Sequence, residues 1–336
     1  MIRDAIIKVA DGKDLEEDEA AQAMTEIMDG VATPAQIGAL ATALKMKGET
    51  VEEIYGFARV MREKATKVPH TRDATTDTCG TGGDHSGTFN ISTTAAFVAA
   101  GAGVAIAKHG NRALTSQTGS AEVLAALGVK IDLSPEKVGH CIDEVGIGFL
   151  FAPALHGAMK HAGGPRKEIG IRTVFNLLGP LTNPAGAKHQ VVGVPDGDLV
   201  EKIAMVLGKL GCRHALVVHG EDGLDEITVT EESRVAEWKS GKVRSFYLDP
   251  QEYGISLAKP QDLKGGDAAA NAEITRAILS GKKGPQRDIV LLNAAAALVA
   301  ADRSATLREG LALAIATLDS GAALKKLEQL TSFSNT

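Results

Sequence analysis

The chain has 336 residues, of which 44% are hydrophobic and 23% are charged, and its 36 basic and 42 acidic side chains give a net charge of −6. This composition is that of an ordinary globular protein and excludes intrinsic disorder. The acidic balance, without any block of Lys or Arg, argues against a constitutive nucleic-acid surface.

Targeting and redox features are sparse. The longest apolar stretches, such as 95–107, are interrupted by glycine and too short to cross a bilayer, and the N-terminus lacks a signal-peptide core. Cys79, Cys141 and Cys212 lie far apart without a CxxC pair, which supports neither a disulfide framework nor a structural zinc site. We therefore expect a cytoplasmic protein with reduced thiols and with neither a membrane nor a nucleic-acid partner.

Residues 1–70 contain no convincing strand and are predicted to form short amphipathic helices. Thr33 and Pro34 supply an N-cap followed by a first-turn proline, and Thr50 and Glu53 fit a capping box. Apolar residues follow both starts at helical spacing. The sequence thus predicts a small all-helical domain over 1–70.

After residue 70 the pattern changes to βα alternation. Short β-branched runs at 104–107, 190–194 and 215–219 alternate with helical segments such as 198–210, which predicts a mainly parallel central sheet flanked by helices. A hairpin is predicted over 235–248, with its turn at Ser240 and Gly241, and alanine-rich helices follow residue 265. We expect a larger α/β domain over 71–336, with its active site at the strand ends.

One segment does not fit either pattern. Residues 163–188 contain three prolines and five glycines, which favours a loop-rich crossing between the two domains. Part of it, about 165–188, is assigned to the small helical domain.

The most informative segment is the glycine-rich stretch 77–93. Glycines at 80, 82, 83 and 87 let backbone amides approach an anion closely, and a helix beginning near Ile91 would point its positive end into the same space. A phosphate-rich ligand is the natural guest, although a plain turn before a capped helix remains an alternative. The stretch is neither a Walker A loop nor a dinucleotide fingerprint, because no Gly-Lys-Ser/Thr follows and His85 takes the last glycine position.

A second polar stretch directly follows the run 104–107. Lys108, His109, Asn111 and Arg112 precede the hydroxyls of residues 115, 116 and 120, which is typical of a second anion cradle. Two cradles suggest two phosphate groups. Taken singly, Lys108 or Arg112 is more often a solvated surface cation, and His109 a loop histidine with its hydrogen bonds satisfied.

Two further features are weaker on local evidence. Asp225 and Glu226 follow the run 215–219, where adjacent carboxylates can bind Mg²⁺, or can simply face water. Arg166 offers forked donors that match a planar carboxylate, or it ties the two domains together as a structural residue.

Together these segments resemble the anthranilate phosphoribosyltransferase family, whose motifs occur here in the family's order across nearly the whole chain. The matching segments are Cys79–Asp84, Asn90–Thr93, Lys108–Arg112, Gly119–Ser120, Arg172–Pro184 (RTVFNLLGPLTNP), Gly223–Glu226, Gly265–Asp267 and Arg287–Asp288. The chain departs from the family pattern at Leu155, where a histidine is frequent, and in the run around Gly164 and Pro165.

The resemblance implies a transferase that moves the 5-phosphoribosyl group from phosphoribosyl diphosphate to the amine of anthranilate, with Mg²⁺, in the second step of tryptophan synthesis from chorismate. It implies that Lys108, Asp225 and Glu226 act electrostatically without a dedicated base, and that Ser92, Asp225 and Glu226 organise Mg²⁺. The implied donor-binding residues are Gly80, Gly83, Asp84, Thr88, Asn90, Ile91, Ser92, Thr93, Lys108, His109, Gly110, Asn111, Arg112, Ala113, Leu114, Thr115, Ser116 and Ser120.

For the acceptor, the resemblance implies that Gly80, Asn111 and Arg166 bind anthranilate and that Pro153 and His156 line its path. It also implies a homodimer formed through the helical domain, and the sequence leaves open whether an anthranilate synthase amidotransferase subunit associates with the dimer. Two alternatives have different chemistry. A pyrimidine nucleoside phosphorylase shares the fold, but its Lys-x-Ser signature is absent at Asp84–Ser86. A non-catalytic nucleic-acid-binding relative should have lost the donor loops and gained a basic surface.

Overall fold

The computed structural model describes residues 1–113 and 118–336. The predicted site residues Leu114, Thr115 and Ser116 lie outside the described residues. In the two described ranges, no helix has both the length and the apolar character needed to span a bilayer.

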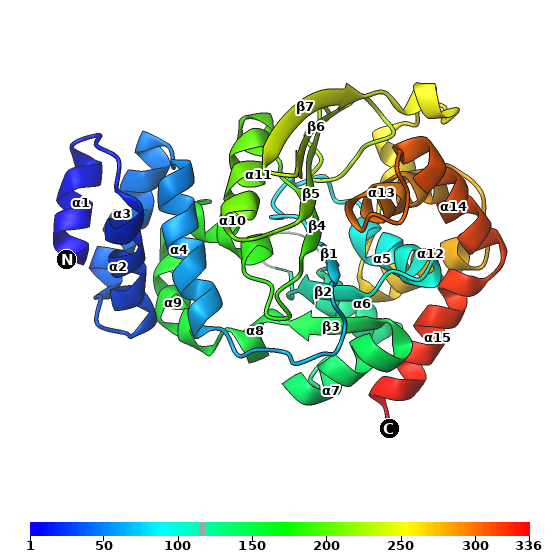
Figure 1. Cartoon of the computed structure of the whole chain (residues 1–336), viewed down its shortest axis with the longest axis horizontal. Helices are drawn as coiled ribbons and strands as arrows, with labels where there is room; N and C mark the ends of the chain where they lie inside the picture. Colours follow the sequence, from blue (N-terminus) through cyan, green and yellow to red (C-terminus); the bar gives the residue numbers. More distant parts are fainter. Residues whose placement is uncertain (114–117) are drawn as a thin grey trace.

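The N-terminal region forms a helical bundle, seen at the left of Figure 1. Its helices are α1 (Ile2–Ala10), α2 (Glu17–Met28), α3 (Pro34–Lys47) and α4 (Val51–Lys64). The hydroxyl of Thr33 accepts a hydrogen bond from the Gln36 amide, and Thr50 and Glu53 form a reciprocal capping box. Both predicted helix starts are confirmed.

The centre of the molecule is a seven-stranded sheet with the order β3-β2-β1-β4-β5-β6-β7. The strands are β1 (Thr76–Thr78), β2 (Ile106–Gly110), β3 (Ile147–Phe151), β4 (His189–Gly193), β5 (His214–Gly220), β6 (Ser233–Lys239) and β7 (Lys242–Leu248). The first five are parallel, and β6 and β7 form the predicted antiparallel hairpin. The mainly parallel sheet is therefore confirmed.

Helices cover both faces of this sheet, because side chains along a strand alternate between its two faces. Val191 and Leu216 belong to one apolar core with α5 and α13, whereas Val192 and Val217 belong to a second core shared with α11 and the bundle. The flanking helices are α5 (Ile91–Gly101), α6 (Ser120–Ala126), α7 (Pro135–His140), α8 (Ala152–Leu155), α9 (Lys160–Ile169), α10 (Val174–Leu181), α11 (Val200–Lys209), α12 (Ala268–Leu279), α13 (Pro285–Ala300), α14 (Leu307–Asp319) and α15 (Ala322–Ser334). Short helical turns lie at Cys141–Val145, Gly157–Met159, Gly197–Leu199, Pro250–Tyr253 and Pro260–Leu263.

The prediction of a loop-rich crossing over 163–188 is wrong, because α9 and α10 occupy much of that segment. In α10, Val174, Leu177, Leu178 and Leu181 are buried at helical spacing, and this burial outweighs the helix-breaking tendency of the internal Pro180. Helix α9 packs against α2 and α3, and α10 packs against α3 and α4. In Figure 1, α10 lies between α4 and the sheet, whereas α9 lies with the bundle, in contact with α2 and α3.

The topology brings the polar segments together. The glycine-rich stretch follows β1, residues 111–113 follow β2, Ala152 and Pro153 follow β3, and the acidic pair follows β5. Since these strands are parallel, all four segments leave the sheet at its carboxyl edge. The strand order reverses at β1, because β2 and β3 lie on one side of it and β4 and β5 on the other.

Candidate active site

A cleft of about 600 Å³ opens at the carboxyl edge of the sheet. It lies between the strand-end loops and the segment that carries α8, α9 and α10. Every predicted site residue that the structure describes lines it. These residues are Gly80, Gly83, Asp84, Thr88, Asn90, Ile91, Ser92, Thr93, Lys108, His109, Gly110, Asn111, Arg112, Ala113, Ser120, Pro153, His156, Arg166, Asp225 and Glu226.

The glycine loop approaches the acidic pair through its backbone. The Gly82 amide donates to Oδ2 of Asp225 at 2.7 Å, and a Cβ at residue 80 would overlap the same carboxylate. Gly82 and Gly83 have φ values of 69° and 77°, in the left-handed region that glycine adopts without strain. The amides of Gly83 and Asp84 find no acceptor among the residues that the structure describes. They are free donors on the wall of the cleft.

The start of α5 supplies the next donors. The Ser92 amide donates to Oε1 of Glu226 at 3.0 Å, which places the acidic pair at the positive end of this helix. Asn90 donates through Nδ2 to the Thr118 carbonyl at 3.2 Å and accepts through Oδ1 from Asn271 at 3.1 Å. The helix start predicted near Ile91 is confirmed.

The two carboxyl groups of the acidic pair are deeply buried rather than facing water. Burial raises the pKa of Asp225 well above its usual range, and the neighbouring Asp84 and Glu226 raise it further. Burial also raises the pKa of Glu226 to about 7, against the opposing effect of Lys108. Two buried acids with too little positive charge around them fit a divalent cation.

The donor set around the pair fits Mg²⁺ in particular. Within residues 1–113 and 118–336, no group of three or more His, Cys, Asp or Glu side chains is arranged to hold a metal by itself. Mg²⁺ is commonly bound by one or two carboxylates together with waters and substrate phosphates, not by an all-protein cage. The pair, with the Ser92 hydroxyl at the same helix start, matches that pattern.

Lys108 lies beneath the cleft and is not a solvated surface cation. Only 3% of it is exposed, and its Nζ donates to the Thr78 carbonyl. The fully buried Asp77 accepts from the His109 amide at 3.0 Å and from Nδ2 of Asn183 at 2.8 Å. Burial raises the pKa of Asp77, while the nearby Lys108 opposes this shift. Asp77 therefore fixes the end of β2 to β1 from below.

Two histidines, His109 and His156, line the cleft next to each other. Nδ1 of His109 lies 3.2 Å from the Gly179 carbonyl oxygen, and Nε2 of His109 lies 3.2 Å from Nε2 of His156. Burial lowers the pKa of His109 to about 3 and that of His156 to about 4. Both rings are therefore neutral at pH 7. Since a carbonyl only accepts, His109 carries its proton on Nδ1, and His156 donates from Nε2 to the bare Nε2 of His109.

Arg166 faces the cleft from α9. Its guanidinium carbon lies 5.6 Å from the ring centroid of Phe175, and burial lowers its pKa. No carboxylate in the part of the chain that the structure describes pairs with it. A half-buried arginine over an aromatic wall, without a protein counter-ion, suits a ligand that carries a planar carboxylate.

Sequence reasoning missed three residues that shape the cleft. Asp77, Asn183 and Arg172 fall in the quoted motifs or beside them but were given no role. The sequence signal for Asp77 is an acidic residue inside a buried strand. A carboxylate buried without hydrogen-bond partners is costly, so such a residue indicates partners elsewhere in the chain. The contact of Arg172 with the glycine loop joins residues 90 positions apart, which no local pattern reveals.

Comparison with known proteins identifies the family. Residues 72–324 match the Glycosyl transferase family, a/b domain, and residues 3–65 match the Glycosyl transferase family, helical bundle domain. The chain is 60% identical over 328 residues to the anthranilate phosphoribosyltransferase of Symbiobacterium thermophilum, covering 98% of this chain and 96% of the relative.

Solved structures give the same result. Anthranilate phosphoribosyltransferase from Thermus thermophilus has a TM-score of 0.94 and 46% identity, covering 99% of this chain and 100% of that one. The enzyme from Saccharomyces cerevisiae, in complex with PRPP and Mg, has a TM-score of 0.90 and 28% identity, covering 99% and 98%. The fold, the arrangement of the cleft and these likenesses agree, and the chain belongs to the anthranilate phosphoribosyltransferase family.

Proposed function

We propose that the protein transfers the 5-phosphoribosyl group from phosphoribosyl diphosphate to the amine of anthranilate, giving N-(5-phosphoribosyl)anthranilate and diphosphate. This is the second step of tryptophan synthesis from chorismate. The observation that carries the proposal is a single cleft lined by free loop amides, a buried acidic pair and Arg166, which pairs with no carboxylate of residues 1–113 or 118–336. Family membership favours this reaction over both alternatives, the nucleoside phosphorylase and the nucleic-acid-binding relative.

The donor occupies the side of the cleft formed by the glycine loop, the start of α5 and the end of β2. Free amides at Gly83 and Asp84 bind phosphate oxygens without adding charge, and Lys108 supplies a buried cation below them. The other donor-side residues implied by the family resemblance line the same wall. Their assignment to the diphosphate, the ribose or the 5-phosphate remains part of this proposal.

Ser92, Asp225 and Glu226 would hold Mg²⁺. When bound, the ion would neutralise charge on the diphosphate oxygens. Because burial and neighbouring carboxyl groups raise the pKa values of both acids, the pair lacks compensating positive charge, and we expect donor binding to depend on the cation.

The acceptor occupies the other side of the cleft. Arg166 pairs with the anthranilate carboxylate, Gly80 and Asn111 lie between it and the donor, and Pro153 and His156 line the access path. The neutral histidine pair keeps this wall free of a competing positive charge, which would draw the carboxylate away from Arg166.

The reaction needs charge neutralisation and positioning more than proton transfer. The bond between C1 of the sugar and the diphosphate oxygen breaks with its electron pair leaving on diphosphate, and the lone pair of the amine nitrogen forms the new bond to C1. The nitrogen then carries a positive charge and is strongly acidic, and it releases one proton to the departing diphosphate or to water. An arylamine is already neutral at pH 7, so its lone pair is available and no dedicated base is required. Lys108 and the loop amides stabilise the charge that develops on the leaving diphosphate.

We also propose a cytoplasmic homodimer that associates through its bundle. Ile7, Val31 and Met46 are 53%, 69% and 84% exposed on the bundle, which supports an apolar contact with a second copy. Sedimentation at several concentrations tests the dimer. Association with an anthranilate synthase amidotransferase subunit is a separate proposal, which co-purification of the two subunits tests.

The decisive experiment mixes purified protein with anthranilate, phosphoribosyl diphosphate and Mg²⁺ and follows the loss of anthranilate fluorescence. Omitting the donor should abolish the signal change, and a chelator should do the same. A double Asp225→Asn and Glu226→Gln variant that stays as active as the wild type would contradict the proposal.

A further inference from the structure

Arg172 joins the bundle side of the molecule to the glycine loop. It lies in the short connection between α9 and α10, the two helices that pack against α2, α3 and α4. Its side chain crosses the cleft, where Nη1 donates to the Gly82 carbonyl and Nη2 lies 3.5 Å from the Thr81 hydroxyl. The connection thereby contacts the glycine loop, which presents the free Gly83 and Asp84 amides to the cleft.

Gly82 is held from both directions. Its amide donates to Asp225 at 2.7 Å, and its carbonyl accepts from Arg172. With both groups of Gly82 fixed, the next peptide unit keeps the orientation in which the Gly83 amide lines the cleft. Successive backbone N–H groups in a turn can form an anion-binding concavity.

The sequence around this contact fits the arginine closely. A Cβ at residue 83 would overlap Nη1 of Arg172, so the guanidinium reaches the loop only because this position is glycine. The φ of 77° at Gly83 has the same requirement. Both the missing Cβ and the left-handed backbone of Gly83 are therefore needed for the contact between Arg172 and the glycine loop.

Arg172 also has hydrogen-bond donors and a positive charge that its contacts with the glycine loop do not fully satisfy. It is half-buried, and no carboxylate of residues 1–113 or 118–336 forms an ion pair with it. Burial lowers its pKa, whereas Asp225 and Asp84 are near enough to oppose this shift. Hydrogen bonds to Gly82 and Thr81 use only part of its five-donor fork. Its location on the cleft wall thus gives a positive charge within reach of an anionic donor.

We propose that Arg172 is a positioning residue for the phosphoribosyl diphosphate site, holding the Gly82 carbonyl so that the Gly83 and Asp84 amides are set for the donor's phosphates. The proposal rests on the proposed function. It assigns the donor side of the cleft a contribution from the α9–α10 connection, and not only from the strand-end loops.

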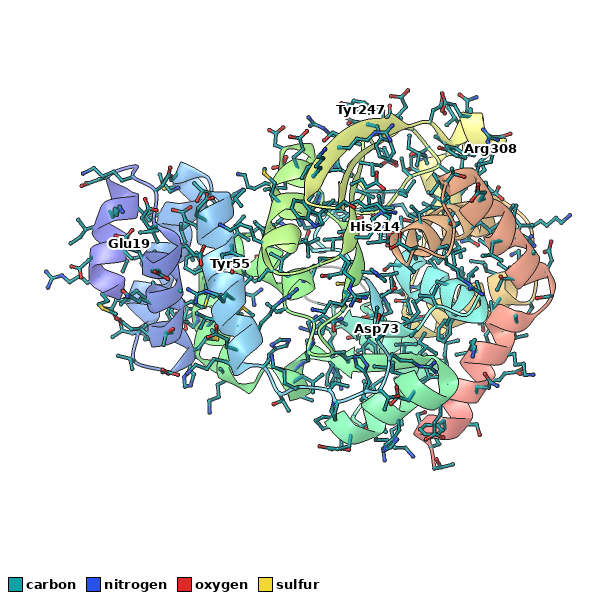
Figure 2. The ribbon with its side chains drawn as sticks, viewed as in Figure 1. Glu19, Tyr55, Asp73, His214, Tyr247 and Arg308 are labelled. Carbon is teal, nitrogen blue, oxygen red and sulfur yellow. The ribbon has the colours of Figure 1, made fainter. Side chains whose placement is uncertain are left out.

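The first test compares Arg172→Met with a matched control, Arg308→Met. Arg308 also donates to a backbone carbonyl, that of Glu252, and stacks over a ring, that of Tyr253, but it lies at the far end of the molecule from the bundle, as Figure 2 shows. Titration calorimetry with phosphoribosyl diphosphate and Mg²⁺ gives the Kd, and steady-state kinetics give KM for each substrate. We expect Arg172→Met to raise Kd and KM for the donor about 10-fold, with KM for anthranilate within about 2-fold of the wild type.

The control variant should retain all three values. Equal increases in KM for both substrates, or no change in the donor Kd, would overturn the proposal. Circular dichroism spectra and thermal melting curves of Arg172→Met test whether this variant folds. If Arg172→Met does not fold, Arg172→Lys takes its place, with an expected rise in donor Kd of about 3-fold or more.

A double-mutant cycle tests the contact itself. Gly83→Ala should weaken donor binding in the wild-type background, both by overlap with Arg172 and by backbone strain. In the Arg172→Met background the overlap is relieved, so the same substitution should cost less, by about 5-fold in Kd. Strict additivity of the two changes would show that Arg172 does not act through residue 83.

These measurements also separate the inference from the proposed function. A wild-type protein that binds phosphoribosyl diphosphate but forms no product with anthranilate would refute the function and leave the Arg172 binding test intact. An active wild type whose Arg172→Met variant binds the donor normally would refute the inference alone. A wild type that does not bind the donor would refute both.

Discussion

The contact between His109 and His156 predicts how the stability of the protein depends on pH. Burial lowers the pKa of His109 to about 3 and that of His156 to about 4, from an ordinary value near 6.5. In the unfolded chain both rings take up a proton below pH 6.5, whereas in the folded protein they stay neutral until about pH 4 and 3. The unfolded state therefore binds more protons in this interval, and the free energy of unfolding falls as the pH is lowered from 6.5.

The size of the effect follows from the same pKa values. At pH 5 each histidine lowers the free energy of unfolding by about 2 kcal/mol relative to pH 7.5 or above. Replacing His156 by Gln, whose amide can still donate to Nε2 of His109, removes one of these two contributions. Titrating groups away from this contact are common to both proteins and cancel in the comparison. His109 keeps its burial, the larger cause of its lowered pKa, and loses only the smaller effect of His156.

Urea unfolding followed by circular dichroism at pH 7.5 and pH 5.0 measures the difference. We expect the wild type to lose about 2 kcal/mol more than His156→Gln between the two values. Nuclear magnetic resonance provides a direct check, since two of the nine histidine rings should show no titration down to pH 5. An equal pH dependence in both proteins, or a His156 ring that titrates near pH 6.5, would refute the reasoning.

Three further predictions concern the cleft. Lys108→Met should lower kcat/KM by about 10²-fold to 10³-fold in the fluorescence assay, because a buried cation near the leaving diphosphate is lost. His109→Gln should lower kcat/KM by less than about 10-fold. Similar losses in the two variants would count against electrostatic catalysis. Arg166→Gln should raise KM for anthranilate about 10-fold and leave KM for the donor unchanged, and a change in the donor value alone would place the carboxylate site elsewhere. Gly80→Ala should displace the Asp225 carboxylate, so a magnesium titration should give half-maximal activity at a higher concentration than in the wild type; an unchanged midpoint would separate residue 80 from the metal site.

Local rules predicted the elements whose cause is local. The starts of α3 and α4 follow from Thr33 and Thr50, whose hydroxyls cap amides three residues ahead. The polar segments were found because each lies at or just after the end of a buried strand, and parallel strands bring their carboxyl ends to one edge. The expectation that Lys108 and His109 lie in a loop after the strand is wrong, because both belong to β2 itself. This is why the predicted site residues that the structure describes line one cleft.

What the sequence did not reveal depends on contacts between distant segments. Helix α10 forms despite Pro180 because four buried residues face the bundle, and proline content alone gave no measure of that burial. Asp77 was overlooked because its partners His109 and Asn183 come from two other parts of the chain. The contact of Arg172 with Gly82 likewise exists only once the α9–α10 connection is placed against the loop.

The two sides of the cleft differ in the kind of atom that they present, and this bears on how acceptor range can be altered. In the proposed arrangement, the donor side relies strongly on main-chain amides, which are the same whatever side chain is substituted, whereas the acceptor side relies on side chains such as Pro153, Arg166 and Phe175. Substitutions confined to these acceptor positions can therefore change which arylamines are accepted without changing the binding of phosphoribosyl diphosphate. A mutant library limited to them is a rational starting point for biocatalysts that phosphoribosylate other aromatic amines.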